Sequence, residues 1–563
     1  MPERNAARRK DLLIFTAVSV LVLLPNALLL WRSPSVAFAI DAVVKALLLW
    51  LWFTVTLGTA RRALLLALPF LLLLPAEAYF VYVYGYPTSK YIVAVIAETH
   101  PREVTELLSG IVVWLALVLV VLCTLWFALY RAASGAPLWP GRVRIAVFLC
   151  GALALGAIEG ARYLGAEPYA IRSFTLAPAY PIGVPVRLLG HAKIHLQSRE
   201  ARAQIAGHRF GASSQAERVT VVLVIGESSR PDHWSVNGYA RETTPRLARR
   251  EHLYFMRDLV SPWTLTLYAV PLMIKRKPAA QTAIFNERSI LAAFGEAGFK
   301  TFFLTNQEGV LELDLHAGEA AVRGLYNFAA GRSDGDEVND ERMLPDLKRH
   351  ILDDPAPRKL LVVHSKGSHW DYHLRYPDAY RKFVPDQAAS AAGKYDASQA
   401  AALRNAYDNS IAYTDFFLDE IIGYLTAARG PAALIYVSDH GELLYDEGCP
   451  MWGHGNDSEI NFRTAGFVWL SPALVRTRPE LPKALAATST RRLTTEGMVF
   501  ATLANLGQLS IADTALSLLN PAITPPVRLV HTSQGAVDFD RAPRSGICRI
   551  VGRGGQPRDP SQE

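Results

Sequence analysis

The chain has 563 residues, of which 51% are hydrophobic, and it carries a formal net charge of +7. This length suffices for several domains, and the apolar content excludes a purely soluble protein, because long apolar runs concentrate before residue 160. The positive charge does not indicate nucleic-acid binding, since many of the basic residues flank those apolar runs.

Five apolar segments account for most of the first 160 residues. They comprise residues 12–31, 42–60, 63–84, 111–130 and 143–158. A helix needs about 20 apolar residues to cross a hydrocarbon layer about 30 Å thick, and these segments match that length or approach it. The first segment is too long for a signal peptide and lacks a small-residue cleavage site. The sequence therefore predicts a transmembrane domain of five helices at residues 1–160, with Lys45 and Glu77 inside the second and third segments.

Basic residues cluster at three places that share one side of the membrane in this arrangement. They are Arg4, Arg8, Arg9 and Lys10 before the first segment, Arg61 and Arg62 between the second and third, and Arg131, Arg142 and Arg144 between the fourth and fifth. Positive residues favour the cytoplasmic side. Everything after residue 160 is then expected outside the cytoplasm.

The remaining chain divides by composition. Residues 85–110 are amphipathic and face outward, which is typical of a segment resting on the bilayer. Residues 161–218 form either a membrane-surface bridge with a basic helix or a plain linker. A globular domain is predicted at residues 219–540, and the Gly/Pro/Arg-rich tail at 541–563 is expected to be poorly ordered.

Four cysteines occur in the chain. Cys123 and Cys150 lie inside predicted membrane segments, where we expect them to be packing residues. Cys449 and Cys548 lie in the part expected outside, where an oxidising compartment permits a disulfide. Their separation in sequence leaves open whether they pair.

Short buried strands alternate with helical stretches after residue 219. The strands are expected at residues 219–226, 299–306, 359–365, 433–439 and 466–471. Continuous apolar runs separated by helices favour a mostly parallel sheet with helices on both faces. Ligands bind beyond the carboxyl ends of strands in such sheets, so the polar residues there are the first candidates for function.

Carboxylates and imidazoles follow several of these strands. The candidates are Glu227, His364, His369, Asp439, His440 and the later His454. A single strand-end glutamate is usually a cap, and a single histidine is usually structural. Several of them at one edge, however, form a set of oxygen and nitrogen ligands that suits Zn²⁺.

The stretch "SPWTLTLYAVPLM" at residues 261–273 supplies two possible nucleophiles, Thr264 and Thr266. A threonine hydroxyl is inert at neutral pH unless a metal lowers its pKa or a base removes its proton. Pro262 is compatible with a helix that begins near residue 263, and a helix N-terminus would offer N–H groups to a phosphoryl group.

Five stretches together resemble bacterial phosphoethanolamine transferases, membrane enzymes of the alkaline phosphatase/sulfatase superfamily. They are "VIGESSRPDHWSVNGYARETTPRL", "SPWTLTLYAVPLM", "HSKGSHWDYHLRYP", "AYDNSIAYTDFFL" and "VSDHGE". The resemblance covers nearly the whole chain. It implies an inner-membrane protein with five helices and a periplasmic catalytic domain of the alkaline phosphatase/sulfatase-like α/β fold.

The resemblance also implies roles for individual residues. Glu227, Asp439 and His440 would bind zinc together with the nucleophile, and His369 and His454 would serve the phosphate or a second zinc. The family's spacing to the proline at 271 identifies Thr264 as the nucleophile. Residues two apart on a helix point about 200° apart, so Thr266 would then face away.

Substrate contacts are implied at Thr99, Glu103, Asn306, His364 and Glu442. The chain departs from the family at Val95, where relatives carry an asparagine, and after Asn306, where no lysine follows closely. It also has fewer cysteines than many relatives.

The implied reaction is a two-step transfer of phosphoethanolamine from phosphatidylethanolamine to lipid A or a lipopolysaccharide-core sugar, through a phosphothreonine-type intermediate. One zinc ion is expected, a second is left open, and the protein is expected to act as a monomer. The main alternative is a phosphoglycerol transferase of the lipoteichoic acid synthase or glucan type. A non-enzymatic membrane sensor with the same fold is a further alternative.

Overall fold

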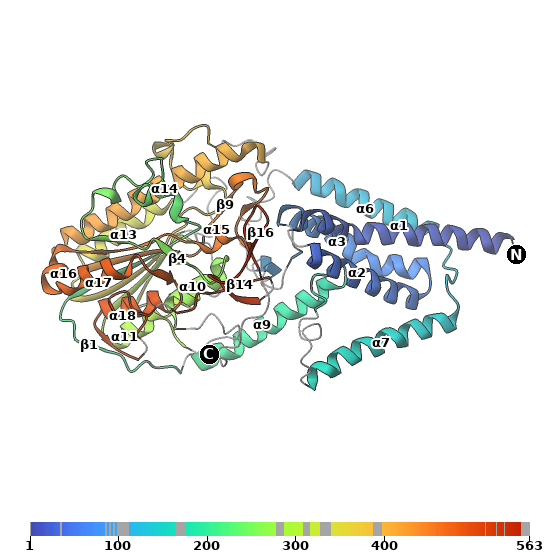
Figure 1. The fold of residues 1–563 in the computed structure, drawn as a ribbon, viewed down its shortest axis with the longest axis horizontal. Helices are drawn as coiled ribbons and strands as arrows, with labels where there is room; N and C mark the ends of the chain where they lie inside the picture. The colour runs from blue at the N-terminus through green and yellow to red at the C-terminus, as the bar shows by residue number, and fades with distance from the viewer. Residues whose placement is uncertain are drawn as a thin grey trace. The chain divides into compact units, whose positions relative to one another are not determined.

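The computed structural model describes residues 2–33, 36–84, 87–88, 92–93, 96–97, 112–164, 175–205, 207–276, 287–307, 316–326, 339–386, 397–512, 514–524, 526–533 and 535–552. The chain divides into two compact units (Figure 1). The first comprises Met1–Ala97 and Leu108–His195, and the second comprises Glu98–Leu107 and Leu196–Glu563. Most of the predicted amphipathic segment, including Thr99 and Glu103, lies outside the described residues.

Within the described part of the chain, five helices of the first unit are long and apolar enough to span a membrane, as predicted. They are α1 (Pro2–Arg32), α2 (Val36–Leu57), α3 (Ala60–Tyr84), α6 (Val112–Ala132) and α7 (Gly141–Tyr163). Large apolar side chains stay exposed on α6 and α7, for example Val113 at 74% and Leu153 at 72%. Exposed apolar surface of this kind marks a membrane-facing helix rather than a helix of a water-soluble core.

An ion pair accounts for the acidic residue inside the third membrane helix. Glu77 on α3 is buried, and its Oε1 lies 3.0 Å from a guanidinium nitrogen of Arg187. Arg187 belongs to α9 (Gly183–Ile205), which is the basic helix predicted in the bridging segment. Because a buried charge is costly unless it is paired, this contact fixes the start of α9 on the first unit. The segment thus contains the predicted helix, and its role as a membrane-surface bridge stays a prediction.

The second unit is built around a seven-stranded sheet of order β3-β11-β8-β2-β7-β5-β6. Its strands are β2 (Val219–Gly226), β3 (Leu253–Phe255), β5 (Lys300–Thr305), β6 (Val322–Leu325), β7 (Arg358–His364), β8 (Ala432–Ser438) and β11 (Gly466–Leu470). The five predicted strands are confirmed, and the short strands β3 and β6 were not predicted. Strands β8, β2, β7, β5 and β6 are parallel, whereas β11 pairs antiparallel with β8 and β3.

Helices cover both faces of the sheet, as predicted (Figure 1). One face packs on α10 (Thr266–Ile274), α11 (Ile290–Glu296), α16 (Pro472–Thr477), α17 (Glu480–Thr488) and α18 (Met498–Leu506). The opposite face carries α13 (Leu344–Leu352) and α14 (Ala400–Ala427). Alternate residues of β2, Val221 and Leu223, pack with Val270 of α10 and Phe294 of α11 in the apolar core. This packing places the N-terminus of α10 near the sheet edge.

Three small sheets and one short helix complete the surroundings of the large sheet. They are β1 (Ser213–Ser214) with β13 (Leu509–Ser510), β4 (Asp258–Val260) with β12 (Arg492–Thr494), β9 (Leu443–Leu444) with β10 (Trp452–Gly453), and α15 (Glu459–Phe462).

The C-terminal segment folds, contrary to the expectation of a poorly ordered tail from residue 541. The tail contains the hairpin of β16 (Arg544–Ser545) and β17 (Ile550–Val551), and the hairpin of β14 (Leu529–Thr532) and β15 (Gly535–Asp538) precedes it within the predicted domain. Cys548, between β16 and β17, forms a disulfide with Cys449. Ordering a segment rich in glycine and proline costs conformational entropy. The disulfide and the strand pairing offset that cost here. Residues 553–563 lie outside the described residues.

Candidate active site

The edge of the sheet brings together three of the predicted metal ligands. β2 ends at Gly226 and is followed by Glu227, and β8 ends at Ser438 and is followed by Asp439 and His440. Gly226 pairs with Ser438, so both strands leave the sheet at the same level. Possible ligand atoms of Glu227, Asp439 and His440 lie within 4.8 Å of one another, and all three residues are buried. We call these three residues the strand-edge cluster.

The hydroxyl group that faces the strand-edge cluster belongs to Thr266, not to Thr264. Thr266 Oγ1 lies 2.6 Å from Asp439 Oδ2 and 3.1 Å from Glu227 Oε2. The same oxygen lies 3.5 Å from His440 Nε2. The expectation that Thr264 occupies this place is therefore wrong, and so is the expectation that Thr266 faces away.

The start of α10 explains the error. The helix begins at Thr266, and Leu265 before it has an extended backbone with φ of −140° and ψ of 128°. A helix that began near residue 263, as expected from the sequence, would contain both threonines. Thr264 lies before the helix, so its direction does not follow from helix geometry. Its carbonyl oxygen accepts a hydrogen bond from the backbone N–H of Gly455, at 3.0 Å.

The state of His440 suits a metal ligand. Its Nδ1 lies 2.9 Å from the carbonyl oxygen of Gly441, which only accepts hydrogen bonds, so Nδ1 carries the proton and Nε2 presents a lone pair. Nε2 points to the cluster, 3.2 Å from Asp439 Oδ2 and 3.5 Å from Glu227 Oε1. Two carboxylates and a neutral imidazole form a donor set that fits Zn²⁺.

The electrostatics of Glu227 also favour a cation. Burial, and next the neighbouring Asp439 carboxylate, raise the pKa of Glu227 well above its usual range. Ser228 Oγ donates to Glu227 Oε1 at 2.8 Å, and Gln307 Nε2 donates to Oε2 at 3.2 Å. These donors orient the carboxylate but leave the repulsion between the two acids, which a bound cation would remove. Gln307 was not predicted, although it lies only one residue beyond Asn306.

His454 and Glu442 form a second group beside the cluster. His454 Nδ1 lies 2.8 Å from Glu442 Oε2, and Tyr372 donates its hydroxyl to Glu442 Oε1 at 2.5 Å. Burial lowers the pKa of His454, but the carboxylate of Glu442, together with those of Glu227 and Asp439, raises that pKa to about 9. The rings of His440 and His454 have centroids 4.3 Å apart. Ligand atoms of His440, Glu442 and His454 also lie within 4.8 Å of one another, so these residues could hold a second cation.

Of the other predicted site residues, His369 lies near His454, whereas Asn306 and His364 have different surroundings. The ring centroid of His369 lies 6.1 Å from that of His454, and burial lowers the pKa of His369 well below its usual value. Asn306 donates to Asp340 Oδ1 at 2.9 Å. His364 at the end of β7 is fully buried, and neither ring nitrogen has a hydrogen-bond partner among the described residues. Substrate contact through Asn306, His364 or Glu442 stays a prediction.

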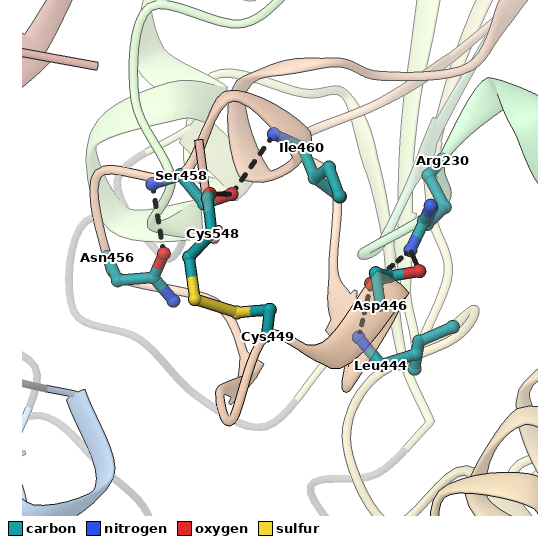
Figure 2. Close-up of a disulfide and its surroundings, with 8 residues drawn as sticks. All are labelled: Arg230, Leu444, Asp446, Cys449, Asn456, Ser458, Ile460 and Cys548. Atoms are coloured by element: carbon teal, nitrogen blue, oxygen red, sulfur yellow. Dashed lines mark hydrogen bonds and ion pairs between the residues drawn. A yellow bond between two sulfur atoms is a disulfide. The ribbon is translucent and has the colours of Figure 1, made fainter. Parts of the chain in front are cut away.

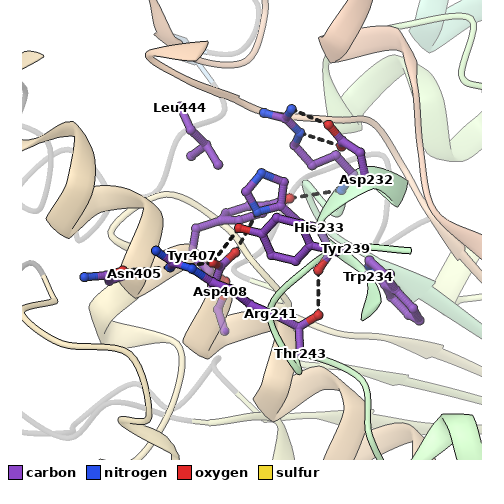
Figure 3. Close-up of polar contacts among 12 residues, drawn as sticks. Asp232, His233, Trp234, Tyr239, Arg241, Thr243, Asn405, Tyr407, Asp408 and Leu444 are labelled. Carbon is purple, nitrogen blue, oxygen red and sulfur yellow. Dashed lines mark hydrogen bonds and ion pairs between the residues drawn. The ribbon is translucent and has the colours of Figure 1, made fainter. Parts of the chain in front are cut away.

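A buried carboxylate holds the loop that follows Glu227 (Figure 3). Asp408 on α14 is inaccessible to solvent, and its Oδ1 lies 2.6 Å from His233 Nδ1. Its Oδ2 accepts from the Tyr239 hydroxyl and from Arg241, each at 2.8 Å. The stretches "GYAR" and "AYDN", which are far apart in sequence, are thus partners in one network. We call Asp408, His233, Tyr239 and Arg241 the Asp408 network.

Tyr407, next to Asp408 in sequence, connects this network to the strand-edge cluster. Its hydroxyl donates to the carbonyl oxygen of Ser228 at 2.6 Å and accepts from the backbone N–H of Arg230 at 2.9 Å. Ser228 has a φ of 55°, in the left-handed region that non-glycine residues seldom adopt. Its backbone N–H donates to Asp439 Oδ1 at 3.0 Å. The two contacts hold this backbone turn directly beside Glu227.

Comparison with known proteins gives this site a family. The family described as Sulfatase matches residues 219–507. The Kdo(2)-lipid A phosphoethanolamine 7''-transferase of Escherichia coli (strain K12) is 28% identical over 272 residues, 46% of each chain. The chain thus spans about half the length of this relative. The phosphoethanolamine transferase EptA of Salmonella typhimurium is 27% identical over 449 residues, covering 76% of this chain and 78% of the relative.

Two solved structures share the fold. The integral membrane lipooligosaccharide phosphoethanolamine transferase A (EptA) of Neisseria meningitidis aligns over 91% of this chain and 99% of its own, with a TM-score of 0.70 and 20% identity. A zinc complex of the C-terminal periplasmic domain of EcEptC from Escherichia coli covers 59% of this chain and 95% of its own, with a TM-score of 0.52 and 25% identity. The five apolar helices and the C-terminal soluble domain are those of a multi-pass membrane protein. Because the Sulfatase match covers more than half of the sequence, the chain belongs to the sulfatase family.

Proposed function

We propose that this protein transfers phosphoethanolamine from phosphatidylethanolamine to lipid A or a lipopolysaccharide-core sugar, with Thr266 as the nucleophile. The observation that carries the proposal is the Thr266 hydroxyl, 2.6 Å from Asp439 and 3.1 Å from Glu227. A hydroxyl in a cluster of metal-binding groups is the arrangement that nucleophilic phosphoryl transfer needs. Relatives named phosphoethanolamine transferases support the choice of the transferred group.

Glu227, Thr266, Asp439 and His440 would hold one zinc ion. When bound, zinc would lower the pKa of the Thr266 hydroxyl and stabilise negative charge on the phosphoryl oxygens. The zinc complex of the EcEptC domain supports the choice of metal. The donor set in the strand-edge cluster supports it independently.

In the first step, Thr266 Oγ1 forms a bond to the phosphorus, and the bond from phosphorus to the glycerol oxygen breaks. Asp439 Oδ2, which already accepts from Thr266, takes the hydroxyl proton. We assign protonation of the leaving oxygen to His454, whose pKa is raised to about 9, and stabilisation of that oxygen to His369, whose ring centroid lies 6.1 Å from that of His454, so that diacylglycerol leaves as an alcohol. Thr266 begins α10, and the N–H groups of that first turn favour a phosphoryl group on its oxygen.

In the second step, a hydroxyl or phosphate oxygen of the acceptor attacks the phosphothreonine. The bond from phosphorus to Thr266 Oγ1 breaks, Asp439 returns the proton to the threonine oxygen, and the histidine that protonated the leaving oxygen takes the proton of an acceptor hydroxyl. The same residues serve both steps because the second reverses the first. The enzyme therefore needs only one phosphoryl site, to which donor and acceptor bind in turn.

We further propose that the protein acts as a monomer in a bacterial inner membrane, with the second unit in the periplasm. Basic residues flank the membrane helices on the opposite side. The disulfide between Cys449 and Cys548 supports an oxidising compartment for the second unit. Placement in the membrane suits the chemistry, because the donor and the acceptor are both lipids.

Labelled donors test the proposal. The purified full-length protein is incubated separately with phosphatidylethanolamine and phosphatidylglycerol, and diacylglycerol release is measured. Release from phosphatidylethanolamine alone supports the proposal, whereas release from phosphatidylglycerol alone assigns the protein to the phosphoglycerol transferases. Mass spectrometry of lipid A and core from a deletion strain then identifies the acceptor by the loss of phosphoethanolamine.

A further inference from the structure

The C-terminal hairpins contact the segment that leads to Thr266 and the loop that carries His454. We call residues 529–551 the C-terminal clasp; they comprise β14 to β17 and their connections. The sulfatase match ends at residue 507, before the clasp begins. The proposed chemistry assigns no role to any clasp residue.

One contact of the clasp reaches the segment that leads to Thr266. The backbone N–H of His531 on β14 donates to the carbonyl oxygen of Pro262 at 2.9 Å. The His531 ring stacks on Trp263, with centroids 4.4 Å apart and an interplanar angle of 8°. Trp263 in turn packs on Tyr268 of α10 at 4.6 Å. The clasp therefore supports the extended residues that precede the nucleophile.

The other contacts reach the loop that carries His454 (Figure 2). The Cys449–Cys548 disulfide joins that loop to the clasp, and Ser458 Oγ donates to the carbonyl oxygen of Cys548 at 2.8 Å. Asp457 accepts from the backbone N–H of Ser533 at 2.9 Å and from its hydroxyl at 2.6 Å. The loop is thus tied to the clasp on both sides of His454 in sequence.

The body of the domain holds the same loop from a different direction. A guanidinium nitrogen of Arg230 lies 2.9 Å from Asp446 (Figure 2). The same nitrogen donates to the carbonyl oxygen of Glu442 at 3.1 Å. The backbone N–H of Gly455 donates to the carbonyl oxygen of Thr264 at 3.0 Å. The Thr266 segment and the His454 loop therefore contact each other directly and also share the clasp.

The backbone around His454 needs this external support. Gly453 and Gly455 on either side have φ of 80° and 79°. Glycine adopts this region without cost but is equally free to leave it, so local sequence does not fix the position of His454. Contacts from outside the loop must do so, and the disulfide is the only covalent one among the described residues.

We propose that the C-terminal clasp positions the catalytic groups, with Cys449 and Cys548 as positioning residues that hold His454 against the phosphoryl site occupied by Thr266. This inference rests on the proposed function, because it explains the clasp through the role of His454 in the transfer. The disulfide lies five residues from His454 in the loop. It therefore acts on placement and not on the chemistry itself.

The test uses the full-length protein and a double variant, Cys449→Ala with Cys548→Ala, which removes the disulfide without leaving a free thiol. A second variant, Ser533→Ala, removes one hydrogen bond between clasp and loop. The control is Leu481→Ala on α17, a core substitution that lowers stability at a distance from the clasp contacts. For each variant we measure kcat and KM with phosphatidylethanolamine per zinc-loaded protein, the melting temperature, and hydrogen exchange of residues 443–458.

The double variant is expected to lose at least about tenfold in kcat with little change in KM, since small misplacements of reacting groups cost that much or more. Its loop should exchange faster, Ser533→Ala should lie between it and the wild type, and Leu481→Ala should melt earlier with unchanged kcat and loop exchange. Unchanged kcat and unchanged loop exchange in the double variant would overturn the proposal, as would an equal kcat loss in Leu481→Ala. If the wild type transfers nothing from phosphatidylethanolamine, the proposed function fails, and loop exchange alone decides whether the clasp holds the loop.

Discussion

The edge of the sheet and the loops above it differ in how their side chains are placed. Glu227, Asp439 and His440 follow directly from strands whose register is fixed by pairing along their whole length. Thr266, Glu442 and His454 lie on a helix start and a loop whose positions depend on distant contacts. The three proposed metal ligands of the strand-edge cluster are thus placed by strand pairing, whereas the proposed nucleophile Thr266 and the His454–Glu442 pair are placed by tertiary contacts.

This difference leads to separate expectations for the two regions. Substitutions at the strand edge should remove the metal and the activity together. Substitutions in the loops should reduce the rate while the metal stays bound. The predictions below test that division.

The largest effect is expected from Thr266→Ala. Loss of the nucleophile should reduce kcat by about 10³-fold or more, because no neighbouring group replaces a covalent acceptor. Thr264→Ala is the matched control, two residues away, and should keep most of the activity, because the known contact of Thr264 uses its backbone carbonyl. Diacylglycerol release from phosphatidylethanolamine measures both. The reverse ranking would restore Thr264 as the nucleophile and refute the site described above.

A slightly smaller loss of kcat is expected from a substitution in the strand-edge cluster. Asp439→Asn keeps the shape of the side chain but removes one of two anionic ligands, so zinc content and kcat should fall together, by about 10²-fold or more for kcat. Elemental analysis beside the transfer assay checks this. A protein that keeps full zinc occupancy but loses activity would show that Asp439 acts chiefly on the Thr266 proton. Excess zinc should restore part of the activity in Asp439→Asn and none in Thr266→Ala.

A loop substitution should separate activity from metal binding. Glu442→Gln removes the charge beside His454 and should reduce kcat by roughly 10–100-fold, a size typical of residues that orient a catalytic histidine. Zinc in the strand-edge cluster should remain. Tyr372→Phe, which removes only the hydroxyl donor to the same carboxylate, serves as the milder comparison and should cost less. Loss of all zinc from Glu442→Gln would place this carboxylate in the metal site itself.

The Asp408 network should act mainly on stability. Asp408→Ala leaves His233, Tyr239 and Arg241 without their shared acceptor, and breaking a buried network of this kind costs about 3 kcal/mol. The more accessible pair of Asp419 and Arg250, whose side chains are 15% and 29% exposed, provides the control, since Asp419→Ala should cost about 1 kcal/mol or less. Urea unfolding of the detergent-solubilised protein measures both. Equal losses in the free energy of unfolding would show that the Asp408 network contributes no more to stability than the pair of Asp419 and Arg250.

The sequence predicted what depends on repeated local patterns. The five membrane helices and five sheet strands follow from apolar runs, and the strand-edge cluster follows because parallel strands end at a common edge. The sequence thus predicted that Glu227, Asp439 and His440 would lie together, and their role as zinc ligands stays a prediction. Gln307 lies two residues past the end of β5 and could have been predicted in the same way.

The sequence could not supply what depends on exact element starts and on long-range contacts. The helix begins at Thr266, later than the start expected near residue 263. For this reason Thr266, and not Thr264, faces the strand-edge cluster. The hairpin of β16 and β17 lies in the tail for which the composition indicated disorder, and a disulfide of sequence separation 99 links it to the rest of the domain. Loops of this kind are determined by their partners, which a single sequence does not show.

The most direct test of the account is the identity of the modified residue. The full-length protein is incubated with phosphatidylethanolamine in the absence of acceptor and digested, and the peptide containing residues 261–273 is fragmented by mass spectrometry. The account predicts a phosphoethanolamine group on Thr266 that disappears in Thr266→Ala and when acceptor is added. The same group on Thr264, or an active enzyme that never carries the group on this peptide, would contradict it.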